Sequence, residues 1–193
     1  MRCLFLACLL IFSVSGAAWS STATTEVAGV RLPDRVHVAG RDLVLNGAGL
    51  RKIMFMDLYV AALYLPERRQ DTRDILNRDI PRSFQLTVLR DISTQQNLDV
   101  LKDGLIANNS PEEIEAIQQE VNDFLGYIKS LRELSAGTVI HLNYAPGIGT
   151  RVSVNGRFLG TIPGEAFNRA MLRIWLGNDP TEGKLKRALL GAI

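Results

Sequence analysis

The sequence has almost no cysteine and little histidine. Its two cysteines, Cys3 and Cys8, lie near the start of the chain, and its two histidines, His37 and His141, stand far apart. The remainder of the chain therefore has no disulfide and no thiolate, and it lacks the His-x-x-x-His spacing that binds zinc. We expect no metal site, no cofactor and a fold that is stabilised by its hydrophobic core.

The chain also lacks a strong excess of charge of either sign. It has 22 basic and 20 acidic side chains, and removal of residues 1–23, whose one charged residue is Arg2, leaves 21 and 20. This balance gives no electrostatic reason to expect a nucleic-acid partner. One arginine-rich stretch, residues 66–82, contains acids as well, which predicts a solvated face of mixed charge.

A membrane-spanning run is missing after the first residues. The most apolar segment there, residues 53–65, has 13 residues and contains Asp57, whereas a spanning helix needs about 20 apolar residues. We therefore expect no transmembrane span in the mature chain.

The first 23 residues have a different character from the rest. A short basic start precedes an apolar run over residues 3–14 and a zone of small residues, which is the pattern of a secretory signal peptide. Cleavage after Ser20 or after Ala23 fits equally well, and an uncleaved anchor is the alternative. The sequence thus predicts a periplasmic or secreted protein with a single domain over residues 24–193.

Common catalytic motifs are absent as well. Gly47 and Gly49 begin a G-x-G-x-x-G pattern, but Lys52 stands at its third glycine and a strand, not a helix, is expected to follow. A dinucleotide site needs a helix N-terminus at that place. The sequence contains neither a P-loop nor the G-x-S-x-G elbow of serine hydrolases.

The hydrophobic periodicity predicts an α+β fold. Asn155-Gly156 is a strong signal for a two-residue hairpin turn. Strands are predicted at 27–32, 41–47, 53–65 and 83–91 and as a meander over 138–162, and helices at 72–78, 93–109, 110–131, 164–177 and 182–191. This order favours an antiparallel sheet with helices packed on one side.

Two of these helices have clear apolar stripes. In the first, Ser110 is an expected N-cap and Pro111 an expected first residue. Its predicted buried side chains are Ile114, Ile117, Val121, Phe124, Leu125 and Ile128, and those of the helix at 164–177 are Phe167, Ala170, Met171, Ile174 and Trp175.

Several motifs together resemble the chalcone isomerase-like family, in its exported bacterial branch. They are NGAGLRK, DLYVAALYLP, VLRDIS, SPEE, APGIGTRVSVNGRFLGTIPGEAFNRAMLRIWLG and LKRALLG, and they extend over residues 43–191. The resemblance implies an open-faced β-sandwich, in which a large antiparallel sheet carries a layer of helices and the ligand cleft lies between them. It also implies that the arginine after the Gly-Ala-Gly turn, Arg51, projects into this cleft.

The plant isomerase of this family cyclises a chalcone, with the arginine stabilising the developing oxyanion. By an ungapped comparison, the positions of the other substrate-holding residues of the family fall on Asn97, Gly104, Tyr59 and either Asn168 or Arg169. Only Arg51 matches the family, so little isomerase activity is expected.

Other members of the family bind fatty acids without catalysis. The resemblance then implies that Arg51 pairs with a carboxylate, which suits a guanidinium group. Tyr59 and Tyr64 lie on opposite strand faces, so at most one faces the cleft. Tyr59 is preferred because it shares the strand face of Asp57, and burial in the core is the alternative for it. The remaining expected ligand-binding residues are Asn97, Met54, Met56, Leu101 and Leu105, with Leu58 and Phe167 as further apolar lining.

Three functions follow from these features. The leading hypothesis is an exported, non-catalytic binder of a small amphipathic carboxylate such as a fatty acid. The alternative is an isomerase or lyase that acts on a chalcone-like phenolic or enone substrate, with Arg51 as oxyanion stabiliser. The third is a structural or protein-interaction role, which a cleft filled by side chains would favour. The structural alternative for Arg51 is an ion pair with a nearby acid such as Asp57 or Asp91.

Overall fold

The computed structural model of the chain describes residues 23–131 and 133–192. The expected signal peptide lies almost wholly outside these residues and stays a prediction. The strands are β1 (Thr24–Val27), β2 (Val30–Pro33), β3 (Arg35–Val38), β4 (Arg41–Ile53), β5 (Met56–Leu65), β6 (Arg82–Val88), β7 (Ile92–Ser93), β8 (Glu133–Leu134), β9 (Val139–Ala145), β10 (Gly149–Val154) and β11 (Arg157–Ile162). The helices are α1 (Thr72–Asn77), α2 (Thr94–Asn108), α3 (Pro111–Ala116), α4 (Gln118–Lys129), α5 (Glu165–Leu176) and α6 (Gly183–Leu189).

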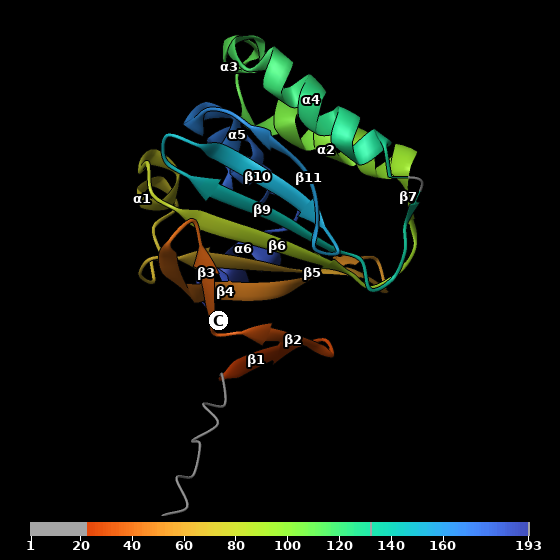
Figure 1. Cartoon of the computed structure of the whole chain (residues 1–193). Helices are drawn as coiled ribbons and strands as arrows, with labels where there is room; N and C mark the ends of the chain where they lie inside the picture. The colour runs from red at the N-terminus through yellow and green to blue at the C-terminus, as the bar shows by residue number, and fades with distance from the viewer. Residues whose placement is uncertain (1–22, 132, 193) are drawn as a thin grey trace, which may run out of the picture.

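One curled antiparallel sheet organises the molecule (Figure 1). Its seven strands have the order β11-β10-β9-β6-β5-β4-β3, and every neighbouring pair is antiparallel. Asn155 and Gly156 form the turn from β10 to β11 with φ angles of 49° and 78°. Both angles are positive, as a type I′ turn requires, so the predicted hairpin is confirmed.

Helices cover one face of this sheet, as the α+β prediction required. α5 lies against the sheet, α4 packs on its edge strand β11, and α2 packs on both of these helices (Figure 1). The predicted inward side chains of α5 are all buried, from Phe167 at 0% to Ala170 at 4% exposure. The apolar period of 3.6 residues thus identified the packed face of this helix correctly.

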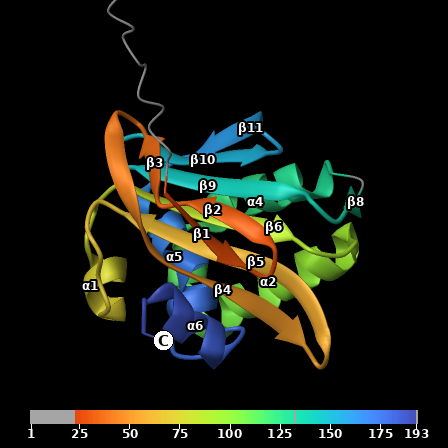
Figure 2. The same cartoon turned by 90° about the horizontal axis from the view of Figure 1, so that it is seen from below.

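The opposite face of the sheet carries a second, smaller apolar cluster. The β1–β2 hairpin lies across this face (Figure 2), and its Leu32 packs with Val60, Ala62 and Tyr64 of β5. Tyr59, on the other parity of β5, packs instead against the main core beneath the helices. The sheet is therefore covered on both sides along β5, and the two tyrosines face apart as predicted.

Three predicted elements are divided in the structure. The strand expected over 27–32 is a hairpin, because a turn at Ala28 and Gly29 separates β1 from β2. The strand expected over 53–65 is broken by a turn at Met54 and Phe55, so its first residues end β4 and the remainder forms β5. The helix expected over 110–131 is divided at Ile117, whose φ of −121° and ψ of 22° are not helical. The capping box at Ser110, with Glu113 as its partner, is present as the sequence indicated.

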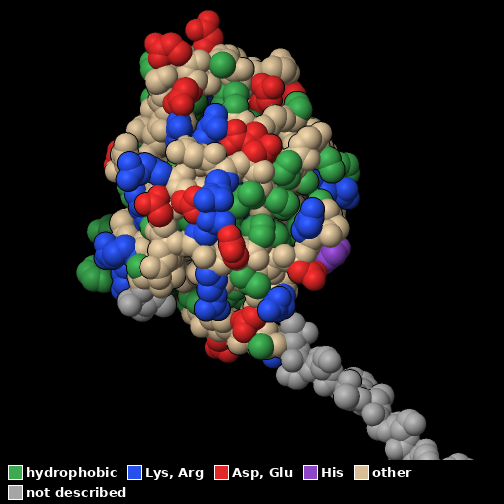
Figure 3. Space-filling view, turned by 90° about the vertical axis from the view of Figure 1, so that its left-hand side faces the viewer, with side chains coloured by type: hydrophobic (Ala, Val, Ile, Leu, Met, Phe, Trp, Pro, Cys, Tyr) green, Lys and Arg blue, Asp and Glu red, His purple; other side chains and the backbone are tan. Residues whose placement is uncertain are grey.

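The arginine-rich segment 66–82 forms ion pairs with acids around it. Arg69 contacts Glu67 and Asp74, and Arg78 also contacts Asp74. Figure 3 shows basic and acidic side chains intermingled over one face of the molecule, in keeping with a face of mixed charge. Arg82 departs from the prediction of a solvated face, because it is 1% exposed and donates to the Ile75 carbonyl oxygen at 2.7 Å. Within the described residues, no helix combines the length and the apolar character that crossing a membrane requires.

Candidate functional site

The candidate site is built on β4, at the place where α6 packs against it. Gly47 and Gly49 lie inside this strand and do not form the turn that was expected there. A Cβ atom on Gly47 would lie 2.1 Å from the carbonyl oxygen of Ala188 in α6, and one on Gly49 would lie 2.7 Å from the Ala188 Cβ. The two glycines therefore let α6 approach the strand closely.

Asn46 fixes this approach from the neighbouring position. Its Nδ2 donates to the Leu189 carbonyl oxygen at 2.8 Å, and its Oδ1 accepts from the backbone N–H of Arg69 at 2.6 Å. Because both its amide groups are satisfied, Asn46 is buried at low cost. The last turn of α6 is thus tied to β4 by a side chain as well as by packing.

Arg51 lies further along β4 and is half-buried. Its Nη1 donates to Glu182 Oε2 at 3.2 Å and to the Lys52 carbonyl oxygen at 2.8 Å. The same Glu182 oxygen accepts from the Lys52 backbone N–H at 3.1 Å. A guanidinium N–H and a backbone N–H thus converge on one carboxylate oxygen, which is an arrangement suited to binding an anion.

The ion-pair partner of Arg51 differs from the two that were expected. Asp57 pairs with Lys52 at 2.8 Å, and Asp91 accepts from the backbone N–H of Ala136 at 2.8 Å. Glu182 is the residue just before α6, and no local feature of the sequence links it to a strand 131 positions away. Only the packing of α6 on β4 brings it to Arg51.

Tyr59 faces Arg51 across the β4–β5 ladder. The Nε1–H of Trp175, on α5, donates to the Tyr59 hydroxyl at 2.9 Å. Removal from water raises the pKa of Tyr59 above 10.0, and the hydrogen bond from Trp175 and the charge of Arg51 counteract this only in part. Tyr59 therefore remains a neutral phenol beside Arg51 over the physiological pH range.

A pocket of about 370 Å³ lies between β4 and α6. Lys52 and Glu182 both contribute to its wall, whereas Arg51 and Tyr59 are not part of the lining and reach the pocket only through the contact of Arg51 with Glu182. Its full lining is Gly49, Leu50, Lys52, Glu182, Lys184, Leu185, Arg187, Ala188 and Ala192. The walls are mainly apolar and three basic side chains stand around them, a combination that suits an amphipathic anion.

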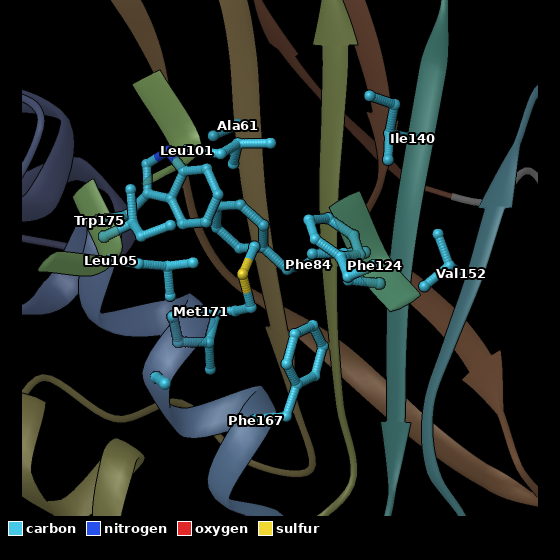
Figure 4. Packing of buried hydrophobic residues seen from close by; sticks show 14 of the residues in the cluster. Ala61, Phe84, Leu101, Leu105, Phe124, Ile140, Val152, Phe167, Met171 and Trp175 are labelled. Atoms are coloured by element: carbon cyan, nitrogen blue, oxygen red, sulfur yellow. The ribbon is translucent and has the colours of Figure 1, made fainter. Parts of the chain in front are cut away.

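The space between the sheet and the outer helices is filled by side chains. Trp175 stacks on Phe84 with ring centroids 4.5 Å apart, and Figure 4 shows these rings packed with Met171, Leu105 and Leu101. The two leucines are at most 7% exposed and belong to this core. They were expected to line a cleft, but in this structure they contribute to a closed interior.

The other predicted residues on α2 have different positions. Asn97 is half-buried on this helix. Gly104 lies where α2 meets α5, and a Cβ atom there would lie 2.8 Å from Ile174 Cγ2. Close helix packing therefore explains the glycine at this position.

Met54 and Met56 do not line any covered space, and this corrects the expectation for them. They lie at the turn between β4 and β5 with 84% and 46% of their surfaces exposed. The reason is the hairpin itself, since a strand running straight through residues 53–65 would have kept both side chains beside the sheet. Leu58, also expected in the lining, is half-buried on β5.

Within the described residues, no three His, Cys, Asp or Glu side chains cluster closely enough to hold a metal ion.

The chain belongs to the chalcone isomerase-like family, whose model matches residues 24–191. Among solved structures, the chain is similar to a fatty-acid binding protein of Arabidopsis thaliana, with 15% identity and a TM-score of 0.67. This similarity covers 84% of the present chain and 92% of the plant protein. No curated protein matches the sequence. The fold expected from the sequence is thereby confirmed.

Proposed function

We propose that the protein is a non-catalytic binder of a small amphipathic carboxylate, such as a fatty acid. Arg51 holds the carboxylate, with Tyr59 beside it, and the pocket between β4 and α6 receives the apolar part of the ligand. The protein is exported through the signal peptide at residues 1–23 and acts in the periplasm or outside the cell, as a member of an exported bacterial branch of its family.

The observation that carries the proposal is the position of the Glu182 carboxylate. It accepts from Arg51 Nη1 and from the Lys52 backbone N–H, so these donors already hold a carboxylate in the wall of the pocket. A ligand carboxylate that uses the same donors has to displace Glu182. Membership of a family in which a solved relative is titled a fatty-acid binding protein supports the choice of ligand class.

Native mass spectrometry of residues 24–193 with added dodecanoic and hexadecanoic acid tests this proposal. We expect a 1:1 complex for the wild type, and at least tenfold weaker binding for Arg51→Ala. Arg51→Lys should fall between them, because an ammonium group retains the charge but loses the forked geometry. Glu182→Gln should bind more tightly, since the competing carboxylate is removed while the size of the side chain is kept.

Arg157→Ala is the matched control, because Arg157 is exposed on β11 at the other end of the strand order. It should bind as the wild type does. Absence of any fatty-acid adduct on the wild type, or equal binding by Arg51→Ala, would contradict the proposal.

An isomerase or lyase acting on a phenolic or enone substrate is the second candidate. It is favoured by the pairing of Arg51 with the neutral phenol of Tyr59, because a cation and a hydroxyl donor can together stabilise an oxyanion. Turnover of a chalcone that is lost in Arg51→Ala and reduced in Tyr59→Phe would support this candidate over simple binding.

A further inference from the structure

The turn between β4 and β5 exposes four apolar side chains in a row, which we call the apolar tip. Their exposed fractions are 40% for Ile53, 84% for Met54, 97% for Phe55 and 46% for Met56. Single exposed apolar residues are common and need no explanation, whereas a contiguous group at one place marks a surface that meets something apolar. In Figure 2 the β4–β5 hairpin projects beyond α6.

The backbone of this turn does not favour the residues that occupy it. Met54 has a φ of 56°, a left-handed conformation that glycine, asparagine and aspartate adopt more readily. The two-residue turn between β10 and β11 uses the preferred Asn155-Gly156 pair. Local stability therefore gives no reason for Met54 and Phe55, and their side chains must serve another purpose.

Acidic side chains beside the tip are already neutralised. Asp57 pairs with Lys52 at 2.8 Å, and Glu182 pairs with Arg51 at 3.2 Å. Asp57 is the acidic residue closest to the tip in the chain, and Glu182 is the acidic residue of the pocket wall. Both are therefore paired with a basic side chain. These pairs leave the surface next to the tip without an unpaired acid from these elements.

Two basic side chains remain at this end of the molecule. Lys184 and Arg187 are exposed on α6, and neither forms an ion pair within the part of the chain that the structure describes. Both line the β4–α6 pocket together with Lys52, the residue that precedes the tip. An exposed apolar protrusion thus stands beside a surplus of positive charge.

We propose that the apolar tip inserts into the interfacial layer of a lipid bilayer with anionic headgroups, which Lys184 and Arg187 contact. Apolar side chains flanked by basic ones are the combination that binds such surfaces. A protein partner fits less well, because a stable interface buries about 800 Å² on each partner. A convex turn of four residues cannot supply that area, whereas a bilayer closes around a small protrusion.

Membrane docking would also place the proposed binding site near its ligands. This step of the inference rests on the proposed function. Lys52, the residue before the tip, lines the β4–α6 pocket. A docked molecule therefore holds this wall of the pocket close to the bilayer surface. An amphipathic carboxylate can then pass between bilayer and pocket without first dissolving in water.

Vesicle co-sedimentation of residues 24–193, which contain every described helix and strand, tests the docking. The probes are vesicles of phosphatidylcholine alone and of phosphatidylcholine with phosphatidylglycerol at about 7:3. The variant Met54→Asn/Phe55→Gly replaces the two most exposed residues of the apolar tip, and asparagine suits the positive φ at position 54, so the variant should fold. Ile148→Ser is the matched control, since Ile148 is 63% exposed in the turn between β9 and β10.

We expect the wild type and Ile148→Ser to bind the anionic vesicles more tightly than the neutral ones. The tip variant should bind the anionic vesicles at least tenfold more weakly. Cysteine is absent from residue 24 onward, so Phe55→Cys carrying an environment-sensitive fluorophore reports insertion directly through a blue shift. The same label at Ile148→Cys should show none.

Failure of the wild type to bind either kind of vesicle, or equal binding by the tip variant, would overturn the proposal. So would a wild-type dimer that dissociates on the tip substitution without any vesicle binding, because the tip would then belong to a second copy. Fatty-acid binding is measured separately in vesicle-free solution. Loss of vesicle binding alone removes only the docking, and loss of ligand binding alone removes only the proposed function.

Discussion

Gly47 is one of the two glycines that allow α6 to approach β4 closely. An alanine Cβ at this position would lie 2.1 Å and 2.7 Å from the carbonyl oxygens of Ala188 and Leu189. Backbone atoms cannot yield as a flexible side chain does, so the end of α6 must shift. We expect Gly47→Ala to lower the free energy of unfolding by about 1–3 kcal/mol in urea denaturation.

Gly126→Ala serves as the control for this prediction. Gly126 lies within α4, and nothing is within 4 Å of the position that its Cβ would occupy. The substitution should raise the free energy of unfolding by about 0.5–1 kcal/mol, because alanine favours the helix more than glycine does. A similar gain from Gly47→Ala would mean that α6 does not pack tightly on the strand.

The same two glycines illustrate what a sequence can and cannot indicate about single residues. The Gly-Ala-Gly run predicted a turn, because glycine is the usual residue of turns. The structure uses Gly47 and Gly49 for close packing within a strand instead. Both uses need a residue without a side chain, so composition alone does not distinguish a turn from a close approach between distant segments.

At the scale of elements, Glu113 joins the start of α3 to α5. Its Oε2 accepts from the Ser110 backbone N–H at 3.0 Å and from Arg173 Nη1 at 2.7 Å. The Arg173 hydrogen bond, followed by that of Ser110, lowers the pKa of Glu113 below 4.5. The folded state therefore binds a proton at this carboxyl less readily than the unfolded state does.

Because the pKa of Glu113 is lower in the folded state than in the unfolded state, its carboxylate should stabilise the protein at pH values above the unfolded-state pKa. This contribution should be lost as the pH falls through the folded-state pKa. We expect Glu113→Gln to be less stable than the wild type at pH 7, with a difference that shrinks toward pH 3. Urea denaturation across this range measures it. In an Arg173→Gln background the substitution should cost less, and an unchanged cost would show that the two side chains are not coupled.

The elements themselves were predicted better than their ends. The 3.6-residue apolar period identified the buried Ile117, Val121, Phe124 and Ile128 correctly, although the helix is divided at Ile117. A short break does not disturb such a period, so the apolar pattern does not indicate it. The β4–β5 hairpin was not predicted, because Met54 and Phe55 are not residue types that usually occupy turns.

For the whole molecule, the order of strands and helices was sufficient to predict an antiparallel sheet with a helical layer. The candidate site was predicted only in part. Arg51 and Tyr59 were named from the family resemblance, and they are neighbours across two paired strands. Glu182 was not named, since it reaches Arg51 only through the packing of α6. Contacts between distant segments are set by the complete fold, which no local pattern records.

The closed interior leads to a last prediction about the whole molecule. Trp175 is 3% exposed, stacks on Phe84 and donates to Tyr59. Trp175→Ala should therefore leave an apolar cavity and lower the free energy of unfolding by about 3–5 kcal/mol. For a chain of this length, each kcal/mol corresponds to a fall in Tm of about 2–4 °C in calorimetry.

An apolar cavity of this kind stays dry and accepts small apolar molecules. Indole should therefore bind to Trp175→Ala, raise its Tm again, and leave the Tm of the wild type unchanged. The β4–α6 pocket does not include Trp175, but Trp175 donates to Tyr59, so the folded variant should bind fatty acid as Tyr59→Phe does. Unimpaired stability without indole binding would mean that the interior is not closed, and a loss of fatty-acid binding greater than that of Tyr59→Phe would place the ligand between the sheet and α5.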